Sequence, residues 1–121
     1  MRYLLLIQGS NDPSQQADPA EREGMLKEYW EFTRSIVDSG EFVSGEALQP
    51  PELATTVRVR NDETLTTDGP FAETKEVLGG YYLVDCTDLD RAIELAARIP
   101  DARIGGIEIR PVIDQSGTGE S

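Results

Sequence analysis

The run Asp68–Glu76, DGPFAETKE, is the segment of this sequence whose residue types could do chemistry. The carboxylate of Asp68 could serve as a general acid or base if burial raised its pKa toward neutrality. The ammonium group of Lys75 could hold a substrate carboxylate, and Phe71 is a single aromatic residue in polar surroundings. We therefore predict that Asp68 is catalytic and that Phe71 and Lys75 bind the substrate.

The same run also has a structural interpretation. Asp68 could cap a turn, Phe71 could fill the core beneath it, and Lys75 could join a solvated cluster of charges. Gly79 and Gly80, which follow the run, could let a backbone approach a ligand closely or could form a bulge in a strand. Spacing alone does not choose between the two interpretations.

Two tyrosines, Tyr29 and Tyr81, are predicted to bind the substrate as part of the cavity wall. Each combines an apolar ring with a hydroxyl group that can form hydrogen bonds. For Tyr29 and the neighbouring Trp30, packing in the core or in a dimer is the alternative interpretation.

The composition excludes several classes of function. The chain has no histidine, and this removes the commonest general base and the commonest transition-metal ligand. Zinc sites, histidine-dependent triads and haem ligation are therefore excluded, and no metal or cofactor is expected. The single cysteine, Cys86, cannot form an internal disulfide and is expected to act as a small buried hydrophobe.

The charge balance and the N-terminus restrict the partners. The chain carries 11 basic and 23 acidic side chains, for a net charge of −12. Neither nucleic acid nor a membrane is therefore an expected partner. The apolar run within MRYLLLIQG is too short for a signal peptide or a membrane span. We expect a cytoplasmic protein.

The elements that must position the site follow from hydrophobic periodicity and turn signals. In chain order they are a strand at 3–8, a helix from Pro19 to before Gly40, a strand at 41–48, a hairpin at 55–67, a strand at 81–86, a helix between Leu89 and Pro100, and a strand at 107–113. Asp18 is the expected N-cap of the first helix and Gly40 its left-handed C-cap, and a capping box at 87–90 begins the second helix.

Helical spacing also predicts which residues pack in the core. The predicted packing residues are Met25, Leu26, Ile36 and Val37 in the first helix and Leu89, Ala92, Ile93, Ala96 and Ala97 in the second. With 121 residues, 38% of them hydrophobic, the chain can close one modest core. We predict a single domain at 1–114 and a flexible C-terminal tail at 115–121.

The order of elements predicts an α+β, ferredoxin-like fold, a split βαβ pattern with an inserted hairpin. Two helices can cover only one face of such a sheet. The strands at 3–8 and 81–86 are apolar on both faces, so their second face needs a partner. The expected solution is a homodimer that packs sheet against sheet.

The run DGPFAETKE, the following Leu78–Tyr82, the helix end Ala96–Pro100 and the closing Glu108–Val112 resemble the DGPF group of YCII-related proteins. The resemblance spans nearly the whole chain. It implies a ferredoxin-like subunit that forms a dimeric α/β barrel, and it implies no settled activity.

In the wider YCII-related group, a histidine on the first helix approaches an aspartate near the end of the second, and one relative is a dehalogenating enzyme. This chain has no histidine, and Gly24, Met25 and Leu26 lie where one would be sought. Ile99 precedes Pro100 where the aspartate would be expected. The histidine–aspartate mechanism is therefore not carried over.

Two functions follow from the residues and the resemblance together. The first is a small-molecule-binding or enzyme-like domain with Asp68 as acid or base. The alternative is a non-enzymatic regulatory accessory of an extracytoplasmic-function sigma factor, because relatives in the group are encoded next to such factors. The expected partners are thus a second copy of the chain, a small-molecule ligand or a sigma factor.

Overall fold

The structure, a computed structural model, describes residues 1–10, 18–71 and 76–113. The predicted tail at 115–121 lies outside these residues. The elements are β1 (Arg2–Ser10), α1 (Pro19–Ser39), β2 (Phe42–Ala47), the 3₁₀ helix η2 (Pro51–Leu53), β3 (Thr55–Arg60), β4 (Glu63–Asp68), β5 (Glu76–Asp85), α2 (Leu89–Ala97), the 3₁₀ helix η3 (Pro100–Arg103) and β6 (Gly106–Pro111).

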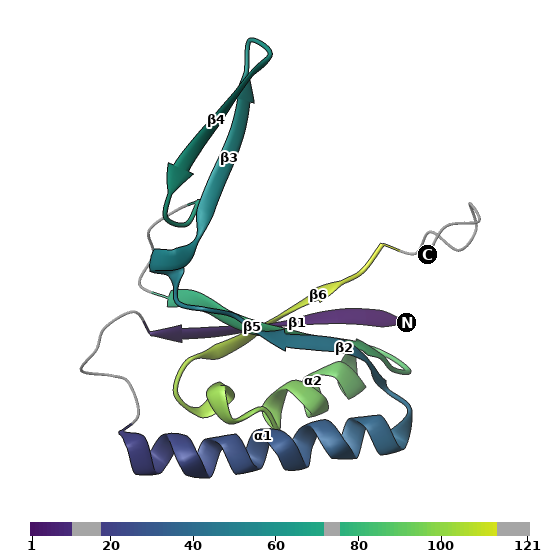
Figure 1. Cartoon of the computed structure of the whole chain (residues 1–121). Coiled ribbons are helices and arrows are strands. Elements are labelled where there is room, and N and C mark those ends of the chain that lie inside the picture. Colours follow the sequence, from purple (N-terminus) through teal and green to yellow (C-terminus); the bar gives the residue numbers. More distant parts are fainter. Residues whose placement is uncertain (11–17, 72–75, 114–121) are drawn as a thin grey trace.

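Four strands form the main sheet in the order β2-β5-β1-β6, and all neighbouring pairs are antiparallel. Strands β1 and β2, which α1 connects, are therefore parallel and flank β5. Strands β5 and β6, which α2 connects, flank β1 in the same way. This twofold split βαβ arrangement is α+β and compatible with the predicted ferredoxin-like fold. Strands β3 and β4 form a separate sheet that projects from the body (Figure 1).

Both α-helices lie on the same side of the main sheet (Figure 1). Along β1, the buried residues Tyr3, Leu5 and Ile7 alternate with the partly exposed Leu4 and Leu6. Because successive side chains of a strand point to opposite faces, the first three face the helices and the other two face away. The prediction that the helices cover one face of the sheet is confirmed.

We call the uncovered side of the sheet the open face. Its centre is apolar and consists of Leu4 and Leu6 from β1 and Tyr81 and Leu83 from β5. Leu4 is paired with Leu83, and Leu6 with Tyr81. The two central strands therefore present a four-residue apolar block that no helix covers.

The core between the sheet and the helices is apolar and continuous. Its buried residues are Tyr3, Leu5, Ile7, Phe32, Ile36, Tyr82, Val84, Cys86, Ala92, Leu95, Ala96 and Ile99. The thiol of Cys86 is free and buried, as predicted.

Both predicted ends of the first helix are confirmed. The carboxylate of Asp18 accepts a hydrogen bond from the backbone N–H of Glu21 at 2.8 Å, and Gly40 closes α1 with a left-handed φ of 83°. The second helix begins one residue later than the predicted capping box at 87–90 implies: its N-cap is Asp88, which accepts from the backbone N–H of Arg91 at 2.9 Å. These ends form locally because each satisfies backbone groups that the helix itself leaves unpaired.

The predicted packing stripe of α1 is wrong in part. Ile36 is buried as predicted, but Leu26 and Val37 are 58% and 53% exposed. In their place, α1 buries Phe32. The apolar pattern fits more than one helix face, and only the direction from which the sheet approaches selects the buried one.

The predicted stripe of α2 is shifted as well. Ala92 and Ala96 are buried as predicted, together with Leu95. Leu89 and Ile93 are instead about half exposed, at 47% and 50%. Ala92, Leu95 and Ala96 are therefore the side of α2 that faces the core.

Strand β5 begins at Glu76, upstream of the predicted start at Tyr81. Its pairing with β1 shifts at Gly79, the extra residue of a bulge. A β-carbon on Gly80 would lie 2.8 Å from the carbonyl oxygen of Glu46 on β2. The bulge interpretation of the two glycines is therefore confirmed.

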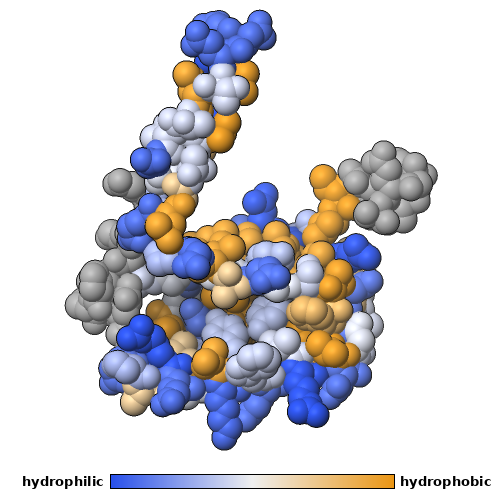
Figure 2. Space-filling model, in the orientation of Figure 1, coloured by the Kyte–Doolittle hydropathy of each residue, from blue (hydrophilic) through white to orange (hydrophobic). Residues whose placement is uncertain are grey.

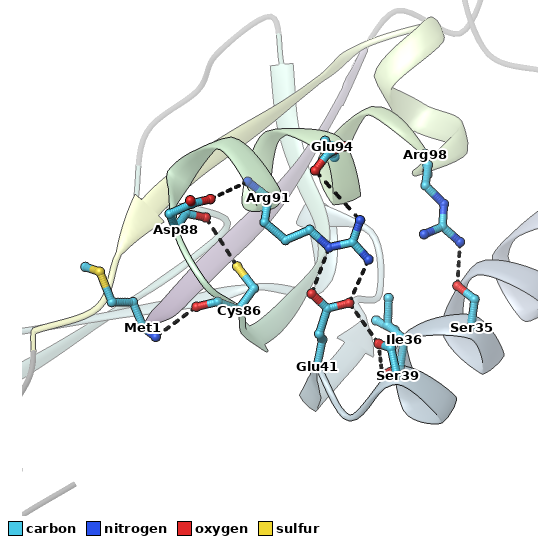
Figure 3. A network of polar contacts seen from close by, with 10 residues as sticks. All are labelled: Met1, Ser35, Ile36, Ser39, Glu41, Cys86, Asp88, Arg91, Glu94 and Arg98. Carbon is cyan, nitrogen blue, oxygen red and sulfur yellow. Dashed lines mark hydrogen bonds and ion pairs between the residues drawn. The ribbon is translucent and has the colours of Figure 1, made fainter.

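A polar network joins α2 to the end of α1 (Figure 3). The guanidinium of Arg91 donates two hydrogen bonds of 2.9 Å to the two carboxylate oxygens of Glu41. Ser39 donates to the same carboxylate at 2.8 Å, and Arg98 donates to Ser35 at 2.5 Å. Because bidentate pairing is geometrically specific, the network fixes α2 relative to α1 and thereby positions η3, which follows α2.

Candidate functional site

Two residues far apart in the chain meet between α1 and η3. The hydroxyl group of Tyr29 donates a hydrogen bond of 2.6 Å to Oδ1 of Asp101. Both residues are partly buried. A distance this short is typical of a hydroxyl donating to an ionised carboxylate, one of the stronger kinds of hydrogen bond in proteins.

The backbone of η3 holds Asp101 in place. Its carbonyl oxygen accepts hydrogen bonds from the N–H groups of Ile104 at 3.2 Å and Gly105 at 2.8 Å. Gly105 in turn lies against β1, where a β-carbon on it would overlap the carbonyl oxygen of Gln8. The segment that carries Asp101 is thus held against β1 by a contact that requires glycine.

Gly9 of β1 lies next to the Asp101 carboxylate. A β-carbon on Gly9 would lie 3.9 Å from Oδ2 of Asp101, in ordinary van der Waals contact. Among the described residues, Tyr29 is the side chain that donates to Asp101, and it uses Oδ1. Oδ2 lies next to Gly9 and is not used by this hydrogen bond.

The electrostatics of the pair keep the tyrosine protonated. Burial, and then the hydrogen bond to Asp101, raise the pKa of Tyr29 far above its ordinary value. The nearby cation, Arg103, is engaged elsewhere, because its guanidinium donates two hydrogen bonds of 2.9 Å to Glu28. These hydrogen bonds lower the pKa of Glu28. The arrangement is a neutral donor and a carboxylate acceptor, with the adjacent positive charge already paired.

A second hydrogen-bonded pair, this one between two hydroxyl groups, lies on the same side of the sheet. The hydroxyl oxygens of Tyr82 on β5 and Thr33 on α1 are 2.6 Å apart, and burial raises the pKa of Tyr82. Gly45 on β2 makes room for the ring, since a β-carbon there would lie 2.9 Å from it. Thr33 follows Tyr29 by one helical turn. Two successive turns of α1 thus each carry a polar side chain that is hydrogen-bonded to another element, Tyr29 to η3 and Thr33 to β5.

The residues predicted for the site from the sequence lie in different parts of the fold. Tyr29 is on the helix side of the sheet, whereas Tyr81 is on the open face. Asp68 is the last residue of β4 and is exposed. Lys75 lies outside the described residues. The single chain therefore does not bring Tyr29 and Tyr81 into one cavity wall.

Phe71 does not fill the core beneath the turn, which was its structural interpretation. Its side chain is 78% exposed, and the guanidinium of Arg58 on β3 lies 4.8 Å from the centre of its ring. This cation–π contact ties Phe71 to the base of the β3–β4 hairpin. Phe71 and Asp68 thus belong to the base of the hairpin.

Sequence reasoning missed Asp101 completely. It lies directly after Pro100, the predicted end of the second helix, and one position after that proline rather than before it, where Ile99 stands. No local signal marks Asp101, because its partner Tyr29 is 72 positions away in the sequence. The pair arises only when α1 and η3 pack together.

Two further observations concern the described residues, with their gaps at 11–17, 72–75 and 114–121. They contain no group of three or more His, Cys, Asp or Glu side chains placed to hold a metal ion. No helix among them is long and apolar enough to cross a membrane.

Comparison with known proteins gives two matches that span almost the whole chain. The family description "YCII-related domain" matches residues 1–116. An uncharacterized protein of Rhizobium meliloti (strain 1021) is 34% identical over 114 residues, which cover 93% of this chain and 92% of the relative.

Proposed function

The chain belongs to the family of YCII-related domain proteins, and from this premise we propose that it is a cytoplasmic, homodimeric domain that binds a small molecule at an enzyme-like site. The observation that carries the proposal is the Tyr29–Asp101 pair. A carboxylate that a tyrosine hydroxyl holds through one oxygen keeps its second oxygen, next to Gly9, to accept from a ligand donor.

The chemistry of the pair indicates the class of ligand. The free oxygen of Asp101 accepts hydrogen bonds, and among the described residues no unpaired cation lies beside it, since Arg103 binds Glu28. An acceptor without a nearby free cation favours a ligand that brings a hydroxyl or amino donor over one that brings a carboxylate. Tyr29 fixes the orientation of Asp101 through Oδ1 and leaves Oδ2 for the ligand.

Asp68 keeps its proposed role as an acid or base, as a second carboxylate at the base of the hairpin. Because Asp68 is exposed in the single chain, this role requires that something else covers it. Phe71, three residues further along, is the aromatic wall proposed for the same place. Asp101 and Asp68 are thus separate candidates, and single variants distinguish between them.

The homodimer is part of the proposal, and the open face supports it. Around the apolar block, the neighbouring strands carry polar residues on the same face, because Leu6 is paired with Glu108 and Tyr81 with Glu46. An apolar centre with a polar rim is the usual anatomy of a protein interface. No contact or charge pattern among the described residues favours the sigma-factor accessory role.

A thermal-shift screen tests the ligand site. The wild-type protein is screened with small hydroxy and amino compounds, and each compound that raises the melting temperature is measured again with variants. Asp101→Asn is expected to abolish the shift, because it removes the charge of the carboxylate. Tyr29→Phe is expected to reduce the shift, because the carboxylate then loses the hydrogen bond that fixes its orientation. Asp38→Asn, an exposed aspartate on α1, is the control with the same change of charge and should leave the shift intact.

Two results would contradict the proposal. A shift of equal size in Asp101→Asn and in the wild-type protein would exclude Asp101 from the binding site. A wild-type protein that no compound of the panel stabilises would count against small-molecule binding as its function.

A further inference from the structure

The β3–β4 hairpin, residues 55–68, forms an arm that rises from the side of the body opposite the helices (Figure 1). Among the described strands, β3 and β4 pair only with each other. An isolated two-stranded hairpin is at best marginally stable in water. An ordered arm of this kind therefore needs a further surface to pack on.

One face of the arm is built from β-branched residues. Val57 is paired with Thr66, and Val59 with Thr64, so these four side chains share one face. The two valines are 57% and 58% exposed, and Figure 2 shows hydrophobic residues along the arm. Stiff, branched side chains on a flat ribbon are suited to packing against another surface.

The open face of the main sheet lies on the side from which the arm rises (Figure 1). A second copy that packs on the open face would therefore lie next to the arm. In a twofold dimer the contact is reciprocal, so that each arm reaches the other copy. A second copy of this chain is thus the occupant for which one contact would cover both the open face and the arm.

We propose that the arm of each copy packs through Val57 and Val59 on the second copy and so clasps the homodimer. This inference rests on the sheet-to-sheet dimer of the proposed function. The base of the arm carries Asp68, which is exposed in the single chain. As the partner of Thr55, Asp68 lies on the same face of the arm as Val57 and Val59. Contact with the second copy through this face covers Asp68, and the part of the site around Asp68 is incomplete without that copy.

A pair of arm variants tests the clasp. Val57→Lys places a charge on the β-branched face, and Thr67→Lys places the same charge one residue beyond the partner of Val57, on the opposite face of the arm. Sedimentation velocity over a range of concentrations gives the dissociation constant of the dimer. Val57→Lys is expected to raise this constant by about tenfold or more, since a buried valine side chain would be lost. The control should change it by less than about threefold.

A cross-linking experiment locates the contact directly. Val59→Cys is labelled with a benzophenone maleimide, while the native Cys86 is 6% exposed and remains unlabelled. The labelled protein is mixed with unlabelled ¹⁵N protein and irradiated, and the expected products join ¹⁴N and ¹⁵N chains. Cross-links confined to one chain within an intact dimer would overturn the clasp and leave the sheet-to-sheet dimer standing. A wild-type protein that stays monomeric would overturn both the clasp and the sheet-to-sheet dimer. The ligand site at Asp101 is tested separately, by the thermal-shift screen.

Discussion

Gly105 lies so close to β1 that a β-carbon on it would overlap the carbonyl oxygen of Gln8. This contact sets the distance between the sheet and η3, the segment that carries Asp101. The hydrogen bond between Asp101 and Tyr29 therefore depends on a glycine that takes no part in it.

Gly105→Ala is expected to lower the free energy of unfolding by about 2 kcal/mol, because the backbone must move to relieve the overlap. The same movement shifts η3, so the variant should also lose ligand-induced stabilisation. Urea unfolding followed by circular dichroism measures the change. Gly106→Ala is the matched control, since a β-carbon there meets nothing within 4 Å, and equal losses in both variants would contradict the prediction.

The Tyr29–Asp101 pair predicts a dependence of stability on alkaline pH. The pKa of Tyr29 is raised from a reference value of 10.0, chiefly by burial and then by the hydrogen bond to Asp101. Its contribution to stability is therefore fully present below pH 10 and is lost as the pH rises further, because only the unfolded chain then ionises the phenol. Urea unfolding of the wild-type protein and Tyr29→Phe should differ most below pH 10, and the difference should shrink above it. A constant difference up to pH 11.5 would show that the hydroxyl is not held in this way.

The pair of Glu41 and Arg91 predicts that stability is lost toward acid pH, whereas the stabilisation by Tyr29 is lost toward alkaline pH. The hydrogen bonds from Arg91 lower the pKa of Glu41 below its reference value of 4.5. The stabilisation is therefore fully present above pH 4.5 and is lost as the pH falls through the lowered value. Glu41→Gln should reduce the free energy of unfolding at neutral pH, and the difference from the wild-type protein should shrink in acid.

The control for this prediction is Glu94→Gln. Glu94 faces the same Arg91 at 3.8 Å, but its side chain is 67% exposed, against 15% for Glu41. Exposed ion pairs contribute little to stability, so the loss should be several times smaller. Equal losses of stability in the two variants would mean that the bidentate geometry of the Glu41–Arg91 pair adds nothing to the stability of the fold.

For a compound whose stabilisation survives Asp101→Asn, Asp68→Asn is expected to abolish that stabilisation. The variant should leave the fold intact, because Asp68 is exposed at the end of β4. An amide keeps the shape of the side chain but cannot accept or release the proton. A thermal-shift measurement with and without the compound found in the screen decides the outcome. Asp62→Asn, at the tip of the same hairpin, is the control, because asparagine tolerates the φ of 64° found there. Unfolding of Asp68→Asn would mean that the aspartate is structural.

Much of the fold was predictable because its signals are local. Asp18 and Gly40 bound the first helix through hydrogen bonds within one turn of themselves. The residues Asn61 and Asp62 make the hairpin turn with positive φ values, which their short polar side chains tolerate. Neither feature depends on any other part of the chain.

The buried sides of the helices were predictable only in part. Leu26 and Val37 have the residue types and the spacing of a core stripe, yet both are more than half exposed. Periodicity shows that a helix has an apolar side, but its rotation about its own axis is set when it packs on the sheet. The alternation along β1 is more reliable, because the two faces of a strand leave no intermediate choice.

By itself, the sequence determined the order of the elements, the ends of the helices and the pairing of the hairpin, since each depends on residues a few positions apart. The tertiary structure decided which polar residues meet. Tyr29 and Asp101 become neighbours only because α1 and η3 are in contact. Likewise, Tyr29 and Tyr81 lie on opposite sides of the main sheet, so that one site in a single chain could not contain both. A hydrogen bond between distant residues has no local pattern, because the packing of the whole domain creates it.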